Sequence, residues 1–93
     1  MHFSDEILIS WVARGDSRAL EILYDRHAAM VLGILVRILG ERTSAEGMLQ
    51  ETFWQVWQRA EMFPSESVVF TSWLFRMARS LAITEMKAKE KNE

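Results

Sequence analysis

The sequence predicts an all-α protein, a compact bundle of about four helices that forms a single domain. Residues that favour helix, namely Ala, Leu, Glu, Arg and Met, are frequent in the 93-residue chain. β-branched residues are scattered rather than gathered in alternating runs, so strands are not expected. One proline and four glycines leave few breaks. Apolar residues recur at helical spacing in four segments, and the expected helices are 4–14, 16–39, 44–62 and 67–88.

The first expected helix begins with a capping residue and two acids. Ser4 can cap it, and Asp5 and Glu6 lie in its first turn, where the helix dipole favours negative charge. Gly15 is expected to end this helix in a left-handed conformation. Asp16 follows directly and can cap the second helix, so two adjacent residues end one helix and begin the next.

The second expected helix is long and has one apolar face. Gly40 is expected to cap its C-terminal end. The residues that recur at helical spacing on this face are Leu20, Leu23, Tyr24, His27, Val31, Ile34, Leu35 and Ile38.

The third expected helix has two distinct faces. The segment from Thr43 to Glu46 reads TSAE, a capping box in which the Thr and Glu side chains satisfy backbone N–H groups at the helix start. At about 100° per residue, one stripe is expected to face the core. This stripe comprises Leu49, Phe53, Val56, Trp57 and Ala60. The opposite side forms a ridge of amides, one acid and one indole, made by Gln50, Glu51, Trp54 and Gln58.

Trp54 has two interpretations. Tryptophan is enriched at interface hot spots, where the ring buries area and its N–H keeps a partner. The alternative is that Trp54 packs at the rim of its own core, as most tryptophans of small domains do.

The fourth expected helix follows a break at Pro64 and the polar SES segment. Ser65 or Ser67 can cap it, and its lysine-bearing end, KAKEKNE, is expected to fray. Its apolar side includes Leu74, Ala78 and Leu81, and Trp73 is assigned to the core. The opposite face carries Ser72, Arg76, Ser80, Ile83 and Lys87, with Arg79 beside it.

The net charge of −2 is unevenly distributed. Residues 1–69 carry six arginines and ten acids, whereas residues 70–93 carry five basic residues and three acids. This basic end indicates a polyanionic partner, with protein partners elsewhere on the acidic body. The alternative is a solvated helix end whose lysines are favoured by the helix dipole.

Several classes of function are excluded by composition. The chain has no cysteine, no apolar run of membrane-spanning length and no signal sequence at its start, which fits a cytoplasmic protein. His2 and His27 are the only histidines, and no catalytic set, phosphate-binding glycine loop or metal-ligand spacing occurs. We therefore expect a protein that is not an enzyme and that needs neither cofactor nor metal.

Three blocks resemble a known family in order and spacing. They are GDSRALEILYDRHAAMV, AEGMLQETFWQVWQRAEMF and FTSWLFRMARSLAI. From about Ser4 to Lys89 the chain is similar to the second domain of bacterial extracytoplasmic-function (ECF) sigma factors. The resemblance implies a promoter-recognition domain of a transcription initiation factor.

The resemblance implies two partners. The helix from Thr43 to Met62 would dock on the clamp helices of the RNA polymerase β′ subunit. The residues implied in this contact are Leu49, Gln50, Glu51, Trp54 and Gln58. The following loop and helix would read the −10 promoter element on the non-template strand, hold an unstacked base and help to open the duplex.

The implied DNA-binding residues also have suitable chemistry. They are Phe63, Ser65, Glu66, Ser67, Ser72, Phe75, Arg76, Arg79, Ser80 and Lys87. Arginine and lysine neutralise phosphates, serine bonds phosphates or base edges, and aromatic rings stack on bases. Four of them have an alternative role: Phe63 as a hydrophobic lid, Phe75 as a core residue, and Arg76 and Arg79 as partners of acids such as Glu51 or Glu61.

The chain departs from the family pattern in three places. Relatives often carry an acid at the position of Gly47, and an aspartate followed by an arginine-rich run where this chain has Thr84. The chain also ends where a linker and a second helix-turn-helix domain, which reads the −35 element, would follow. We expect either an excised fragment or a minimal form.

Two functions remain open from the sequence. The first is a sigma domain that binds polymerase core and −10 DNA. The alternative is a sigma-like interaction module that binds an anti-sigma factor without binding DNA, and an anti-sigma factor is an expected partner in both cases. DNA binding weakens steeply with added salt through counterion release, which distinguishes the two.

Overall fold

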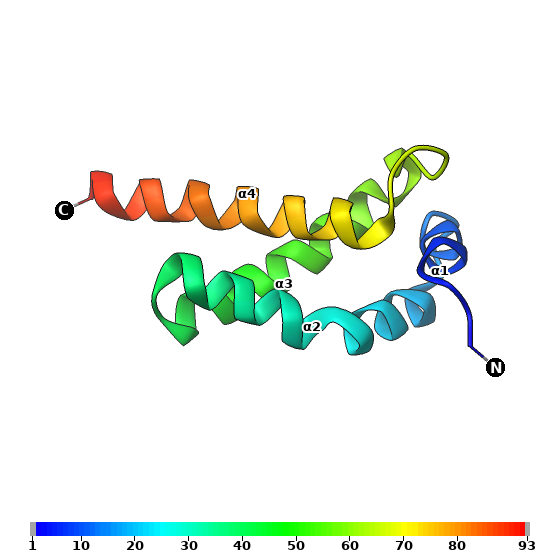
Figure 1. Ribbon diagram of the computed structural model, residues 1–93, viewed down its shortest axis with the longest axis horizontal. Helices are drawn as coiled ribbons and strands as arrows, with labels where there is room; N and C mark the ends of the chain where they lie inside the picture. The colour runs from blue at the N-terminus through cyan, green and yellow to red at the C-terminus, as the bar shows by residue number, and fades with distance from the viewer. Residues whose placement is uncertain (1, 93) are drawn as a thin grey trace.

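Four α-helices and one short 3₁₀ turn make up most of the structure (Figure 1). The computed structural model describes residues 2–92. The elements are α1 Asp5–Val12, α2 Ser17–Leu39, α3 Arg42–Arg59, η1 Ala60–Met62 and α4 Phe70–Lys91. No strand occurs within residues 2–92, so the prediction of an all-α fold is confirmed. None of these helices is long and apolar enough to cross a bilayer.

The long helices α2, α3 and α4 pack against one another, and α1 closes one end of the bundle. α1 contacts α2, η1 and α4, so the first helix lies beside the loop that connects η1 to α4. In Figure 1 this loop and the N-terminus are at the same end, and α4 runs from there to the opposite end. The bundle is elongated, with principal extents of 47, 23 and 20 Å.

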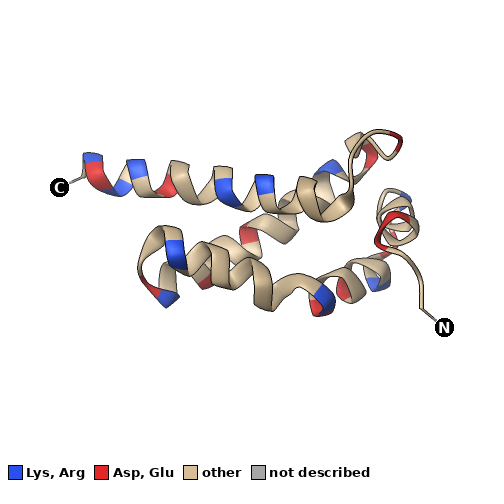
Figure 2. Cartoon of the chain, viewed as in Figure 1, with Lys and Arg blue, Asp and Glu red and all other residues tan. Residues whose placement is uncertain are grey.

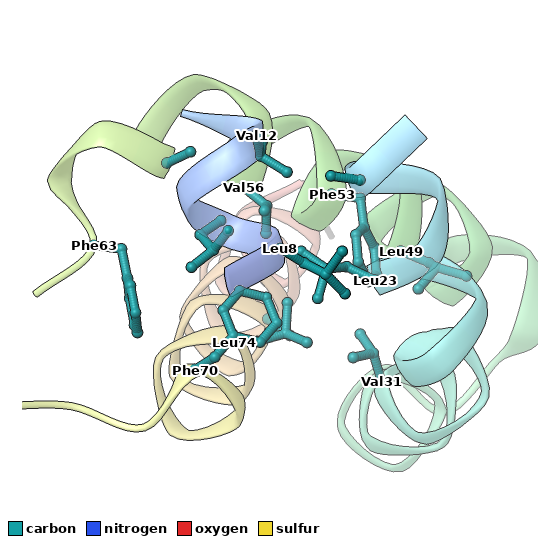
Figure 3. Close-up of a cluster of buried hydrophobic side chains, with 14 of the residues drawn as sticks. Leu8, Val12, Leu23, Val31, Leu49, Phe53, Val56, Phe63, Phe70 and Leu74 are labelled. Atoms are coloured by element: carbon teal, nitrogen blue, oxygen red, sulfur yellow. The ribbon is translucent and has the colours of Figure 1, made fainter. Parts of the chain in front are cut away.

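The core forms where apolar faces of all four helices meet (Figure 3). Phe70, at the first position of α4, is the largest of the fully buried side chains. Of the predicted stripe on α3, Leu49, Phe53, Val56 and Ala60 are buried, whereas Trp57 is only half-buried.

Two helix starts are capped as the sequence predicts. The hydroxyl of Ser4 accepts a hydrogen bond from the Ile7 N–H at 3.1 Å. The carboxylate of Asp16 accepts from the N–H groups of Arg18 and Ala19 at 3.0 and 3.2 Å. The predicted left-handed glycines are also confirmed, because Gly15 and Gly40 have φ values of 91° and 79°.

The predicted capping box at Thr43 is wrong. α3 begins at Arg42, so Thr43 already has helical backbone and cannot act as a cap. Glu46 does not reach back to the helix start but accepts from Arg42 Nε at 2.8 Å. The N-cap residue is Glu41, whose side chain caps no N–H group of the helix.

The predicted cap of the fourth helix is also wrong. α4 begins at Phe70 rather than near residue 67, and its N-cap residue is Val69. Ser67 belongs to a turn in which its N–H and that of Val68 donate to the Pro64 carbonyl at 3.0 and 3.1 Å. The carboxylate of Glu6, on α1, accepts instead from the Phe70 N–H at 3.0 Å.

The lysine-bearing end is helical as far as Lys91, three residues beyond the predicted helix end at residue 88, and Glu93 lies outside the described residues. Lys89 Nζ contacts Glu41 Oε1 at 3.2 Å and also bonds the Ser44 hydroxyl. The hydrogen bond from Ser44, followed by the interaction with Lys89, lowers the pKa of Glu41. The contact joins the end of α4 to the turn between α2 and α3. Because these groups are exposed, it contributes little stability.

The cap at Asp16 gives a stability prediction with an internal control. We expect Asp16→Ala to lower the free energy of unfolding by about 1 kcal/mol, because two N–H groups at the start of α2 lose their acceptor. Thr43→Ala removes a residue that the sequence marks as a cap but that caps nothing, so we expect it to change stability by less than about 0.5 kcal/mol. Urea denaturation of both variants measures this, and equal losses would contradict the assignment.

Candidate functional site

An exposed ridge runs along α3, formed by Gln50, Trp54 and Gln58 and called here the outer ridge. These residues are spaced four apart, and all three are exposed. The Trp54 side chain is 54% exposed, so it is not sealed in the core. Its neighbour Phe53 faces the other way and packs edge-on against Tyr24, with ring centroids 4.9 Å apart.

Two residues that the resemblance placed in the polymerase contact lie beside the outer ridge rather than on it. Leu49 is only 6% exposed and packs in the core, so it supports the ridge from inside. Glu51 is half-buried, and it accepts a hydrogen bond from Gln55 Nε2 at 3.2 Å.

The exposed face of α4 is basic in its first half. Arg76 and Arg79 are exposed, and no acid lies between residues 67 and 84. Within residues 2–92 the ion pairs join Asp5 to Arg26, Arg42 to Glu46, and Lys89 to Glu41, and His27 Nε2 lies within hydrogen-bond distance of Asp5. Neither Arg76 nor Arg79 is paired, so the alternative of pairing with Glu51 or Glu61 does not hold for the described residues. Figure 2 shows the basic bands along α4, with acidic bands only in its C-terminal half.

The remaining predicted residues of α4 divide by burial. Ser72, Ser80 and Lys87 are exposed on the same side as the arginines. Phe75 is half-buried and packs against the core, so only part of its ring reaches the surface.

A cleft of about 300 Å³ separates α3 from α4 and is called here the α3–α4 cleft. From α3 it is lined by Gln55 and Arg59, and from α4 by Trp73, Arg76 and Ser80 among others. Trp73 is half-buried rather than fully in the core. Its ring packs edge-on against Phe63, with ring centroids 5.2 Å apart, and the residue also lines the cleft. The cleft thus combines two guanidinium groups, an indole ring and small polar groups.

Arg59 and Gln55 were missed by the sequence analysis. Both lie on the flank of α3 between the core stripe and the outer ridge, in the helical row that also contains Glu51. The spacing gives the row, but only the packing of α3 on α4 shows that this flank faces the basic helix. Arg59 is exposed and, within residues 2–92, makes no ion pair.

The loop between η1 and α4 is anchored by aromatic rings at both ends. Phe63 is only 9% exposed, and its ring packs edge-on against Phe70 and Trp73. The interpretation of Phe63 as a hydrophobic lid therefore fits, and its ring is not free to stack on a base. Ser65, Glu66 and Ser67 are exposed and, with Glu6, line a shallow hollow of about 430 Å³.

Residues 23–92 match the family described as Sigma-70 region 2, which covers most of the chain. The chain belongs to the sigma-70 region 2 family. This sigma region 2 chain is 31% identical over 80 residues to the ECF RNA polymerase sigma factor SigL of Mycobacterium tuberculosis, covering 86% of the chain and 45% of SigL. The RNA polymerase sigma-H factor of Pseudomonas aeruginosa is 31% identical over 85 residues, which cover 91% of this chain and 44% of the sigma-H factor. The ECF RNA polymerase sigma-E factor of Haemophilus influenzae is also 31% identical, over 86 residues that cover 92% of this chain and 44% of the sigma-E factor.

The predicted resemblance to the second domain of ECF sigma factors is thus confirmed. The chain spans less than half the length of the curated relatives it matches. Among solved structures, an engineered region 2 of sigmaE in complex with GTAAAA superposes with a TM-score of 0.88 at 23% identity. That match covers 97% of this chain and 93% of the other, and it shows that the sigma region 2 fold extends over nearly all of the chain. Sigma factors are not enzymes, so the family agrees with the predicted absence of catalysis.

Proposed function

We propose that this sigma region 2 chain is the promoter-recognition part of a cytoplasmic transcription initiation factor. The outer ridge of α3 binds RNA polymerase core, and the α3–α4 cleft, the basic face of α4 and the adjoining loop bind the −10 element as single-stranded non-template DNA. The observation that carries the proposal is the α3–α4 cleft, where the unpaired Arg59 and Arg76 lie beside Trp73.

The DNA contacts divide into two kinds. Arg59, Arg76 and Arg79 neutralise backbone phosphates, and their lack of acidic partners within residues 2–92 leaves them available. The loop hollow, in contrast, is lined by the carboxylates of Glu6 and Glu66, which repel phosphate. The Glu66 carboxylate is the one that accepts hydrogen bonds from base edges, since Glu6 is bonded to the Phe70 N–H. The phosphates therefore follow α4 while an unstacked base enters the loop. The engineered sigmaE region 2 of similar fold, solved with GTAAAA, supports this assignment.

The polymerase contact uses the other side of α3. Trp54 provides a large exposed ring between two amides, a composition typical of interface hot spots. Arg59 lies five residues further along, about 140° around the helix axis, so polymerase and DNA occupy different faces. Both partners are thus bound by the same protein at the same time.

Binding to labelled oligonucleotides tests the DNA part of the proposal. We expect the folded protein to bind single-stranded GTAAAA more tightly than a permuted hexamer, measured by fluorescence anisotropy. Three phosphate contacts give a slope of log affinity against log salt of about −2, from roughly −0.7 per phosphate on a single strand. Absence of binding at low salt, from protein with full helix content, overturns this part.

The alternative is an interaction module that binds an anti-sigma factor and no DNA. The acidic body of the chain, net −4 over residues 1–69 from six arginines against ten acids, favours it. In that case the oligonucleotides stay unbound, and affinity for an anti-sigma factor changes little with salt. Polymerase core in the same assay separates the two functions, because only the sigma domain binds it.

A further inference from the structure

The first turn of α1 is bonded to two other helices. Asp5 Oδ1 contacts Arg26 Nη1 at 3.1 Å, and Asp5 Oδ2 contacts His27 Nε2 at 3.0 Å, with all three side chains mostly buried. The next residue, Glu6, accepts a hydrogen bond through Oε2 from the Phe70 N–H at 3.0 Å. Two consecutive carboxylates thus join α1 to α2 and to the start of α4.

The start of α4 depends on this contact because it has no local cap. Its N-cap residue, Val69, has an apolar side chain, and the preceding serines do not bond the helix start. The first N–H groups of a helix need acceptors from outside, and a carboxylate there also interacts favourably with the helix dipole. Glu6, which is 64 residues away in the sequence, supplies that acceptor.

Glu6 also borders the loop hollow. The residues that line this hollow with Glu6 are Ser65, Glu66, Ser67, Val68 and Val69. The loop is fixed at one end by the buried Phe63 ring and at the other by Phe70, whose ring is buried and whose N–H is held by Glu6. The distance between the loop and Arg76, six residues into α4, is therefore set partly by the Glu6 contact.

We infer that Glu6 is a positioning residue for promoter recognition. It fixes the first turn of α4 and thereby the place of the loop relative to the α3–α4 cleft. Glu6 acts through the Phe70 backbone, so its removal alters base discrimination by the loop and leaves the phosphate contacts of Arg59, Arg76 and Arg79 unchanged. This inference rests on the proposed function, and it adds a residue from the first helix, outside the loop and α4.

Three substitutions of Glu6 separate the effect of side-chain length from the effect of charge. Glu6→Ala removes the acceptor, Glu6→Asp keeps the charge on a side chain one methylene shorter, and Glu6→Gln keeps the length and an acceptor oxygen but no charge. Glu21→Ala, at an exposed residue of α2 with no side-chain bond within residues 2–92, is the matched control for loss of one negative charge. The readouts are the affinity ratio between GTAAAA and a permuted hexamer, the salt slope and amide exchange at Phe70 measured by NMR.

For Glu6→Ala and Glu6→Asp we expect the affinity ratio to fall about fivefold, the factor that corresponds to the loss of one capping bond. The Phe70 amide exchanges faster in both, and the salt slope is unchanged. Glu6→Gln and Glu21→Ala keep the wild-type ratio. Should Glu6→Ala fail to fold, the contrast between the Asp and Gln variants gives the same answer.

Three results overturn the inference. If the wild-type protein discriminates between the hexamers and Glu6→Asp discriminates equally well, the inference is wrong and the proposed function stands. If the wild-type protein binds neither hexamer, the proposed DNA-binding function is wrong and the inference falls with it. A uniform loss of affinity for both hexamers in the Glu6 variants assigns Glu6 a purely structural role and also overturns the inference.

Discussion

Replacing Arg59 and Arg76 together with alanine is expected to lower the affinity for single-stranded −10 DNA about a hundredfold at low salt. In the proposed site each guanidinium makes a charge-assisted contact with a phosphate, and the loss of one such contact is roughly a tenfold effect. Both side chains line the α3–α4 cleft and neither is paired with an acid within residues 2–92, so no internal partner competes for them. Anisotropy titrations at several salt concentrations measure the effect.

The salt dependence gives a second, independent readout of the same variant. Loss of two phosphate contacts is expected to make the slope of log affinity against log salt shallower by about 1.4. The ratio between GTAAAA and a permuted hexamer stays constant, since phosphates carry no sequence information. Arg18→Ala, at an exposed position of α2 that does not line the cleft, is the control for loss of positive charge. A double variant that binds within twofold of wild type would remove the cleft from the DNA site.

Trp54→Ala is expected to weaken binding to RNA polymerase core by about 2 kcal/mol, roughly 30-fold, as for an interface hot spot. Because the Trp54 side chain is 54% exposed, the same change is expected to alter the free energy of unfolding by less than about 0.5 kcal/mol. DNA affinity in the absence of polymerase stays unchanged, since the outer ridge and the cleft lie on different sides of α3. Surface plasmon resonance with immobilised core polymerase measures the first effect and urea denaturation the second.

Trp57 provides a contrast three residues along the same helix. It is half-buried and packs against the core, so Trp57→Ala is expected to destabilise the protein by roughly 1–3 kcal/mol. Once the loss of folded protein is corrected for, its polymerase affinity is expected to match wild type. If Trp54→Ala instead loses stability and keeps its polymerase affinity, Trp54 belongs to the core and the outer ridge is not the docking surface.

The parts of the fold that could be predicted from the sequence are those fixed by local contacts. The caps at Ser4 and Asp16 join residues two or three apart, and the left-handed glycines act on their own backbone. The core stripe of α3 follows from helical spacing. The start of α4 could not be found this way, because its acceptor, Glu6, lies 64 residues earlier in the chain.

The candidate site shows the same division. Helical spacing separated Gln50, Trp54 and Gln58 from the core, and the structure leaves all three exposed. The role of Arg59 depends on which flank of α3 packs against α4, and that is a property of the whole bundle. The lid formed by Phe63 likewise needs Phe70 and Trp73 from another helix to close around it.

Because both proposed contacts lie on one helix, the distance between them is fixed. Trp54 and Arg59 lie about 140° apart around the axis of α3, and the core stripe of the same helix is buried in the bundle, so one rigid element carries both. The distance between the proposed polymerase contact and the proposed DNA contact is then set by the width of a single helix with its side chains, about 10–12 Å. Substitutions on either flank change the strength of one contact, whereas this distance stays the same for as long as the bundle is folded.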